Sequence, residues 1–384
     1  MNHKGTLTAI IFVLVLFGLL VGFMATDDLL LSLLIIAGGA LGAWIVKRQK
    51  NLAAHLEQAI SQNKNAMGIL GAILVLILPV IFINNTYLIH IFTMTWIFVL
   101  AALGLDMQVG ATGMVNFAQG SLMGIGGYTS ALLVVNFGIS FWLGLPAGII
   151  MAGLWGLILG LPTLKTREYH LSLVTIAFAY ISYLLVLNMD WTGGPDGVPG
   201  IPKPQLFGLV VGKDLLVGGI KLPGAMIYYY FTLFFVGLGL FISNRLRYSW
   251  AGLVWNAVRD DEIACKCFGM NLNKAKLQVF VIGSMYAGAS GVLLAHFLSF
   301  FSTENMSFAI GLIFVCMVIL GGMDNLLGVV AGAMLLVLIP EKFRAFQDFR
   351  LLFYGVVLVS MLLFRPQGLL PNKSRDYKLG GGLK

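Results

Sequence analysis

Charged side chains are scarce in this chain. Of its 384 residues, 10% are Asp, Glu, Lys or Arg and 59% are hydrophobic, whereas a soluble globular domain is about 25% charged. A chain this apolar cannot cover its core with polar surface, so lipid must be the solvent for most of it. The scarcity of charge excludes a soluble fold and predicts a protein that crosses a membrane several times.

Cysteine is rare, and the common ATP-binding motif is absent. Cys265, Cys267 and Cys316 are too few for a disulfide framework, and no histidine accompanies the first two, so we expect reduced thiols and no metal site. The chain has no G-x-x-x-x-G-K-[ST] sequence; residues 208–214 come nearest but differ in spacing and in the last residue. We therefore expect no ATPase site, no enzymatic activity and no cofactor in this chain.

The apolar runs also lack an ionisable residue near their middle. Such a residue costs about 2.5–3.5 kcal/mol on insertion scales and usually marks ion coupling or catalysis. Asp106, Glu168, His90 and His296 are predicted to lie near the ends of runs. This disfavours an ion-coupled secondary transporter and a membrane-embedded enzyme, which are the two rival classes.

Long apolar runs fill most of the chain. About 20 apolar residues cross a bilayer as a helix, and these runs are continuous, unlike the alternating strands of a barrel. The sequence therefore predicts an all-α polytopic membrane protein with about 10–12 transmembrane helices. Candidate segments are 7–24, 28–46, 67–84, 86–106, 115–137, 141–163, 171–190, 225–244, 277–298, 306–322, 325–341 and 350–365. The short, glycine-rich segments 306–322 and 325–341 are candidate half-helices.

The basic residues predict the orientation and the division of the chain. They concentrate in 47–66, in 243–276 and in the C-terminal tail, which all fall on one side if the segments are threaded in order. Cytoplasmic loops carry an excess of Lys and Arg, so we expect both termini inside and the loop 191–224 outside. The predicted parts are an N-terminal extension, 1–84, a core, 85–371, and a cytoplasmic tail, 372–384.

Two glycine-rich stretches carry polar side chains at membrane depth. In 110–128, glycines surround Asn116, Gln119, Ser121 and Tyr128, and a broken helix there is expected to line a pathway. Ordinary packing of small residues is the alternative. In 318–332, Asp324 and Asn325 interrupt the apolar run. The interruption is either a helical hairpin in which Asp324 caps the next helix, or part of the pathway. The pathway candidates are Asn116, Gln119, Ser121, Tyr128 and Asn325.

The loop 192–204 is rich in proline and glycine. Its turn-forming residues predict a stiff, non-helical segment on the outer side. Such a segment either docks a soluble partner or is a compact connector.

The cytoplasmic stretch 250–271 predicts two short helices at a sharp angle. Asp260, Asp261 and Glu262 suit the cap and first turn of the second helix, and Gly269 suits its end. The apolar contacts would be Val254, Trp255, Ile263 and Phe268. Lipid headgroups are an alternative surface for them, but the acidic cluster favours a protein partner.

Several sequence blocks together resemble the family of branched-chain amino acid ABC permeases, specifically the larger, M-type permease of the high-affinity leucine/isoleucine/valine system. The likeness covers roughly residues 85–371. The blocks are Gly104-Leu-Asp-Met-Gln-Val-Gly110, Thr192-Gly-Gly-Pro-Asp-Gly197, Arg259-Asp-Asp-Glu-Ile-Ala264 with Gly269, Leu320-Gly-Gly-Met323, Pro340-Glu341 and Arg365-Pro-Gln-Gly-Leu-Leu-Pro371. One block departs mildly from the family, since Asp260-Asp261 stands where Glu-Asp is commoner.

The resemblance implies an importer in the bacterial inner membrane that moves Leu, Ile or Val by alternating access. The implied partners are a second permease in a heterodimer, two cytoplasmic ATPase subunits that use the ATP, and a periplasmic binding protein. It also implies that the ATPase is contacted by Val254, Trp255, Arg259, Asp260, Asp261, Glu262, Ala264 and Gly269. Permeases for urea and short-chain amides share these motifs, so they remain the alternative.

Single-cysteine labelling tests the predicted orientation. In intact spheroplasts, with the native cysteines replaced, we expect an impermeant thiol reagent to label Lys203→Cys and to leave Asn63→Cys unmodified, because only the first residue is predicted to lie outside. The reverse pattern would contradict the orientation.

Overall fold

The structure is a computed structural model. It describes residues 3–26, 64–163, 168–206, 208–217, 220–342, 349–365 and 367–370, with isolated positions between 31 and 48. The chain divides into two compact units: unit 1 comprises residues 1–89 and 338–345, and unit 2 comprises residues 90–337 and 346–384. The predicted segment 28–46 lies largely outside the described residues and stays a prediction.

Unit 1 holds two apolar helices that pack together, α1 (His3–Ala25) and α4 (Lys64–Ile81). It also includes the first turn of α5 (Thr86–Thr112) and the last residues of α14 (Leu326–Lys342). Polar contacts hold the end of α14 within this unit: Lys342 Nζ donates to Thr26 O (2.6 Å) and Tyr87 Oη to Glu341 Oε1 (2.5 Å).

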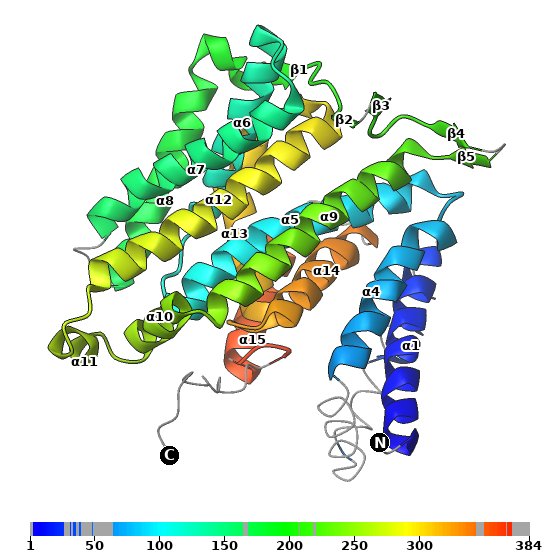
Figure 1. The fold of residues 1–384 in the computed structure, drawn as a ribbon, viewed down its shortest axis with the longest axis horizontal. Helices are drawn as coiled ribbons and strands as arrows, with labels where there is room; N and C mark the ends of the chain where they lie inside the picture. Colours follow the sequence, from blue (N-terminus) through cyan, green and yellow to red (C-terminus); the bar gives the residue numbers. More distant parts are fainter. Residues whose placement is uncertain are drawn as a thin grey trace. The chain divides into compact units, whose positions relative to one another are not determined.

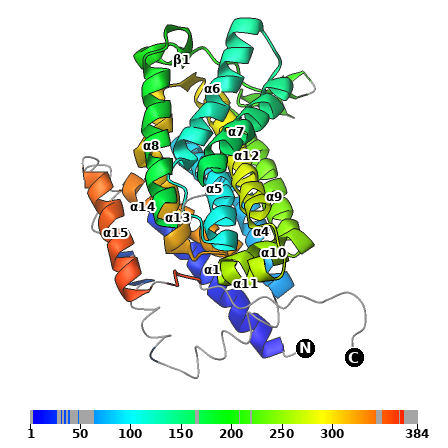
Figure 2. The ribbon, with the colours of Figure 1, turned by 90° about the vertical axis from the view of Figure 1, so that its left-hand side faces the viewer.

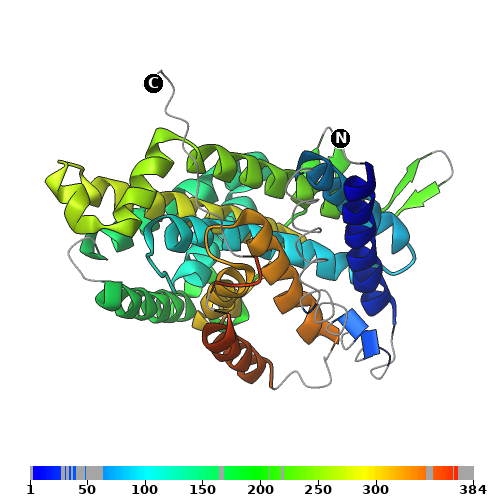
Figure 3. The ribbon, with the colours of Figure 1, turned by 90° about the horizontal axis from the view of Figure 1, so that it is seen from below.

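Unit 2 consists mainly of long helices (Figure 1). Besides most of α5 and α14, these are α6 (Gln119–Phe137), α7 (Phe141–Thr163), α8 (Glu168–Leu187), α9 (Gly224–Arg247), α12 (Leu272–Leu298), α13 (Phe308–Gly321) and α15 (Arg350–Phe364). α13 and α15 pack side by side (Figure 3). The predicted all-α class is confirmed.

Five helices among the described residues are long and apolar enough to cross a membrane, or six if the bent pair Leu171–Leu187 and Asp190–Asp196 is one span. Shorter apolar helical stretches are Val13–Ala25, Gly68–Ile81 and Phe308–Gly321. At about 1.5 Å per residue, the 14 residues of α13 fall short of a 30 Å hydrocarbon core. α13 alone is therefore too short to cross the core, and whether it is a half-helix stays a prediction.

The predicted outer loop is more ordered than expected. It contains the single-turn 3-10 helices η1 (Asp190–Thr192) and η2 (Gly194–Asp196), so the prediction of a wholly non-helical loop was wrong. The strands are β1 (Val198–Pro199), β2 (Gln205–Leu206), β3 (Leu209–Val210), β4 (Leu215–Val217), β5 (Ile220–Leu222) and β6 (Phe300–Phe301), followed by η3 (Thr303–Met306). They pair antiparallel as β1–β6, β2–β3 and β4–β5.

The pairing of β1 with β6 ties this loop to the end of α12. Ile201 N donates to Ser299 O (3.1 Å), and His296 Nδ1 lies 2.7 Å from Pro202 O. The other ring nitrogen of His296 lies 2.9 Å from Ser130 Oγ on α6. The buried imidazole therefore joins the loop 191–224 to two long helices.

Glycines let α6, α7 and α12 meet backbone to backbone. A Cβ atom added to Gly288 of α12 would lie 2.5 Å from Ala152 Cβ, and one on Gly148 of α7 would lie 2.5 Å from Val292 Cγ2. A Cβ atom on Gly126 of α6 would collide with the backbone of Gly288. Small residues are what close helix approach in a membrane requires, because lipid offers no hydrophobic drive for association.

Replacing Gly288 tests this contact. Gly288→Leu should destabilise the protein by about 1–3 kcal/mol, the usual cost of overpacking, and should lower its unfolding temperature in detergent. The control is Gly237→Leu, at an exposed site of α9 with no atom within 4 Å of an added Cβ. Equal unfolding temperatures for the two variants would contradict the predicted role of the glycine.

Candidate functional site

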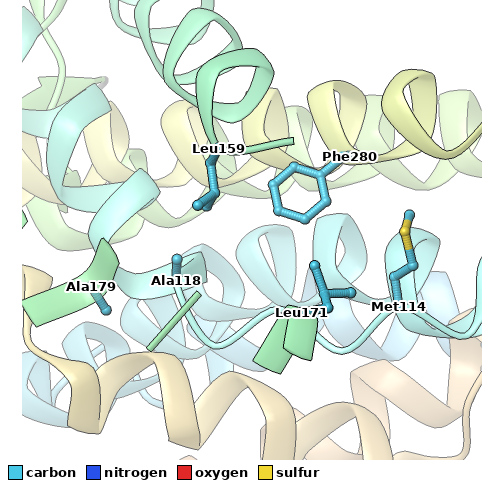
Figure 4. Close-up of a cluster of buried hydrophobic side chains, with 6 residues drawn as sticks. All are labelled: Met114, Ala118, Leu159, Leu171, Ala179 and Phe280. Atoms are coloured by element: carbon cyan, nitrogen blue, oxygen red, sulfur yellow. The ribbon is translucent and has the colours of Figure 1, made fainter. Parts of the chain in front are cut away.

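The helix break expected in 110–128 is present. α5 ends at Thr112 and α6 begins at Gln119, and Gly113 between them has a φ of 76°. The connecting residues are fixed by hydrogen bonds from Ala118 N to Asn116 Oδ1 (2.8 Å) and from Phe117 N to Thr175 Oγ1 (3.2 Å). An apolar cluster surrounds them, made of Met114, Ala118, Leu159, Leu171, Ala179 and Phe280 (Figure 4).

Two of the predicted pathway residues connect helices. Gln119 Nε2 donates to Ala101 O of α5 (2.9 Å) and to Gly283 O of α12 (3.2 Å). Ser121 Oγ lies within hydrogen-bonding distance of Ala179 O of α8 (3.3 Å) and of Met306 O (3.2 Å). Both side chains are buried, so each has a structural role whatever else it does.

On α5, α6 and the residues between them, four buried polar atoms have no hydrogen-bond partner in the described part of the chain. They are Gln108 Oε1, Asn116 Nδ2, Gln119 Oε1 and Tyr128 Oη. Buried polar groups are normally satisfied, so an unsatisfied one needs an explanation. Three of the four belong to residues that the sequence singled out; Gln108 was missed, although a glutamine inside an apolar helix was a usable signal.

Asn325 lies elsewhere, at the break between α13 and α14. Its Oδ1 accepts from Leu327 N (3.2 Å) and Gly328 N (3.3 Å), and its Nδ2 donates to Leu370 O (2.9 Å). Asn325 is therefore the cap of α14, and the expectation that Asp324 caps this helix was wrong. Asp324 has a φ of 65°, and its side chain is directed toward the buried Arg247 and the partly exposed Arg259.

A buried charge cluster is formed by Asp106 of α5, Arg247 of α9 and Asp324. Arg247 Nη2 forms an ion pair with Asp106 Oδ2, and its Nη1 donates to Asp324 O (2.9 Å) and lies 3.6 Å from Asp324 Oδ1. Asp106 Oδ1 accepts from Asp324 N (2.7 Å). The exposed fractions of the three side chains are 0%, 5% and 5%, so the charges are almost completely removed from solvent.

The cluster corrects the prediction for Asp106. Its helix was expected to end at this residue, but α5 continues to Thr112 and leaves Asp106 inside it. The polar end of the helix is stable because its side chains find partners: Arg247 for Asp106, and Phe280 O for Gln108 Nε2 (3.0 Å). The sequence contained one indication of this ion pair, because Asp106 and Arg247 each lie at the end of a long apolar run.

Arg259 joins the cluster from its outer edge. Its Nη1 donates to Gly110 O (2.5 Å) and lies 4.0 Å from Asp324 Oδ2, and its side chain is 37% exposed. Gly110 lets the backbone of Asp324 approach α5 closely, because a Cβ added to Gly110 would lie 2.7 Å from Asp324 N. The side chain of Arg259 is thus directed toward the interior, although the sequence placed it among the surface contacts.

The two predicted short helices are present as α10 (Trp250–Asp260) and α11 (Glu262–Cys267), at the end of unit 2 opposite β1 (Figure 2). Asp261 Oδ1 caps α11 by accepting from Ile263 N (2.8 Å) and Ala264 N (3.0 Å). Asp260 was a candidate for this cap but is the last residue of α10. The left-handed conformation expected at Gly269 is confirmed, with a φ of 73°.

The predicted apolar contacts of this segment fall into two groups. Trp255 is 1% exposed and belongs to the interior, whereas Ile263 and Phe268 are 75% and 81% exposed. Trp250, which the sequence interpretation did not single out, is 75% exposed. We call Trp250, Ile263 and Phe268 the apolar face of the α10–α11 segment.

The acidic residues of this segment affect its buried thiol. Burial, followed by the neighbouring Asp261, Asp260 and Glu262, raises the pKa of Cys265. The thiol therefore stays protonated and unreactive. Among the described residues, no group of three or more His, Cys, Asp or Glu side chains could hold a metal ion.

Comparisons with known proteins identify the family. Residues 87–364 match a family described as the permease component of branched-chain amino acid transport systems. The chain is 37% identical to the high-affinity branched-chain amino acid permease LivM of Escherichia coli and 36% identical to that of Salmonella typhimurium, over 82% of this chain and 77% of each relative. It is also 26% identical to the Escherichia coli permease LivH, over 71% of this chain and 91% of that one. No solved structure matches. The apolar helices, the glycine-mediated packing and these matches together show that the chain is a multi-pass membrane protein and belongs to the branched-chain amino acid permease family.

Proposed function

We propose that this chain is a transmembrane permease subunit of an ATP-driven importer that carries leucine, isoleucine and valine across the bacterial inner membrane. The similarity to LivM over most of the chain supports the substrate, and the similarity to LivH supports a paired second permease. Both termini are proposed to be cytoplasmic.

The observation that carries the mechanism is the apolar face of the α10–α11 segment. Trp250, Ile263 and Phe268 are more exposed than large apolar side chains normally are, beside the charged residues Asp260, Asp261 and Lys266. An apolar surface rimmed by charge suits a protein partner. The partner that fits is an ATPase subunit, since the sequence has no P-loop and energy must come from another chain.

Transport is proposed to proceed by alternating access. A periplasmic binding protein docks on the outer loop 191–224, ATP binding moves the α10–α11 segment, and the helices behind it change the side on which the pathway is open. No substrate bond is made or broken, so the chain acts without a cofactor of its own.

The buried polar atoms near the α5–α6 break are proposed to line the pathway. Asn116 Nδ2 is a donor suited to a substrate carboxylate, and Gln119 Oε1 and Tyr128 Oη suit a substrate ammonium group. Asn116→Asp is the sharpest variant, because it keeps the acceptor for Ala118 N and replaces only the unpartnered donor.

The ion-coupled alternative must be weighed against Asp106, a carboxylate inside a long apolar helix. Its charge is balanced by Arg247, and both of its oxygens accept hydrogen bonds. A carboxylate held in this way is a structural ion rather than a proton carrier, so the ATP-driven mechanism is favoured.

Uptake by the complete complex in proteoliposomes tests the substrate and the energy source. We expect labelled leucine to accumulate in an ATP-dependent manner. Excess urea should not inhibit this uptake, and the uptake should continue after the proton gradient is collapsed. Asn116→Asp should reduce uptake about tenfold, equivalent to about 1.4 kcal/mol, while the complex stays assembled. Uptake of urea in place of leucine, or uptake driven by the proton gradient, would contradict the proposal.

Substitutions in α11 test the ATPase contact. Ile263→Asp should weaken binding of the ATPase subunit at least about tenfold, since apolar anchors dominate interfaces. Leu209→Asp, at a 53% exposed apolar residue of the outer loop, is the matched control and should bind normally. Gly269→Val, which forces a β-branched residue into a left-handed conformation, should uncouple ATP hydrolysis from uptake. Normal binding by Ile263→Asp would show that this face is not the contact.

A further inference from the structure

Arg259 lies in the last turn of α10, and its guanidinium group contacts groups of α5 and of the α13–α14 break. Its hydrogen bond to Gly110 O and its proximity to Asp324 orient it toward the helices of unit 2. An arginine whose Nη1 is held in this way by the chain's own groups is a poor candidate for contact with a cytoplasmic partner.

The two groups that Arg259 contacts belong to the two helix breaks. Gly110 lies in the last turn of α5, just before the α5–α6 break, where carbonyl groups lack helical partners and the helix dipole favours a positive charge. Asp324 lies in the α13–α14 break, between Gly322 (φ 114°) and the cap of α14. One side chain on a surface helix thus bridges both interruptions of the membrane helices.

Asp324 is shared by two arginines that are held very differently. Arg247 is 5% exposed and forms an ion pair with Asp106. Removing Asp106 would leave the charge of Arg247 buried without its partner. Arg259 is 37% exposed and lies 4.0 Å from Asp324 Oδ2. The inner contact is therefore the more strongly held of the two, and the outer contact is the one that a movement of α10 can break and remake.

We propose that Arg259 is a positioning residue that passes movement of α10 to the α5–α6 and α13–α14 breaks, and that it is not itself a contact with the ATPase. The proposal rests on the proposed function, in which the α10–α11 segment meets an ATPase subunit. Asp324 is the receiving group, because its backbone and carboxylate are both held by the charge cluster.

Arg259→Gln in the complete reconstituted complex tests the proposal. We expect the affinity for the ATPase subunit to stay within about twofold of the wild-type value, and the number of leucine molecules imported per ATP to fall at least about fivefold, the lower range of coupling between sites. Arg245→Gln, which removes an exposed arginine from the last turn of α9, is the matched control and should couple normally.

A second set of variants guards against simple misfolding. Arg259→Lys, which keeps the charge and loses the fork of donors, should recover part of the coupling. Asp324→Asn should uncouple alone, and combining it with Arg259→Gln should add little, as expected for two groups that act through one contact. Fully additive losses would contradict the shared contact.

Two results would overturn the proposal. One is wild-type coupling in Arg259→Gln; the other is a loss of ATPase affinity large enough to account for the loss of transport. Ile263→Asp distinguishes failure of this proposal from failure of the proposed function. That variant should weaken ATPase binding whether or not Arg259 transmits the movement of α10. Normal ATPase binding by Ile263→Asp would reject the interface of the proposed function, whereas wild-type coupling in Arg259→Gln would reject the role of Arg259.

Discussion

The ion pair between Arg247 and Asp106 is the constraint on which the end of unit 2 that carries α10 and α11 depends. Ions that are removed from water lose several kcal/mol of hydration each, and the loss is recovered only when their hydrogen-bonding groups are satisfied in good geometry. Here the recovery requires α5, α9 and the α13–α14 break to stand at one relative position. Because Arg247 is the last residue of α9, the start of α10 is fixed as well.

The same constraint explains the unusual backbone near Asp324. A non-glycine residue at positive φ is uncommon, although Asp tolerates it better than most residues. The strain is compensated because this conformation presents the amide of Asp324 to Asp106 and its carbonyl to Arg247. The segment 367–370 is hydrogen-bonded to the end of α13, with Leu369 N and Leu370 N donating to Leu320 O and Gly321 O.

The sequence predicted the parts of the fold that depend on local signals. Apolar length located the helices, and cap chemistry located α11 and the left-handed Gly269, because these features arise within a few residues. What it missed depends on residues far apart in the chain. The extension of α5 past Asp106 requires Arg247, 141 residues away, and β1 requires β6, about a hundred residues later. Trp255 and Ile263 look equally apolar in the sequence, and only the packing of α10 and α11 shows that the first is internal and the second exposed.

The contact between His296 and Pro202 of the loop 191–224 determines which ring nitrogen of the imidazole carries the proton. Pro202 O has no proton to give, so Nδ1 of His296 must carry one, and in the neutral ring Nε2 is left as the acceptor for the hydroxyl of Ser130. The tautomer is therefore set by a backbone carbonyl of the loop. Lifting Pro202 away would free the ring to exchange its proton between the two nitrogens and would reverse the direction of the hydrogen bond with α6. The position of the proton on His296 thus depends on whether Pro202 of the loop is in contact with the ring.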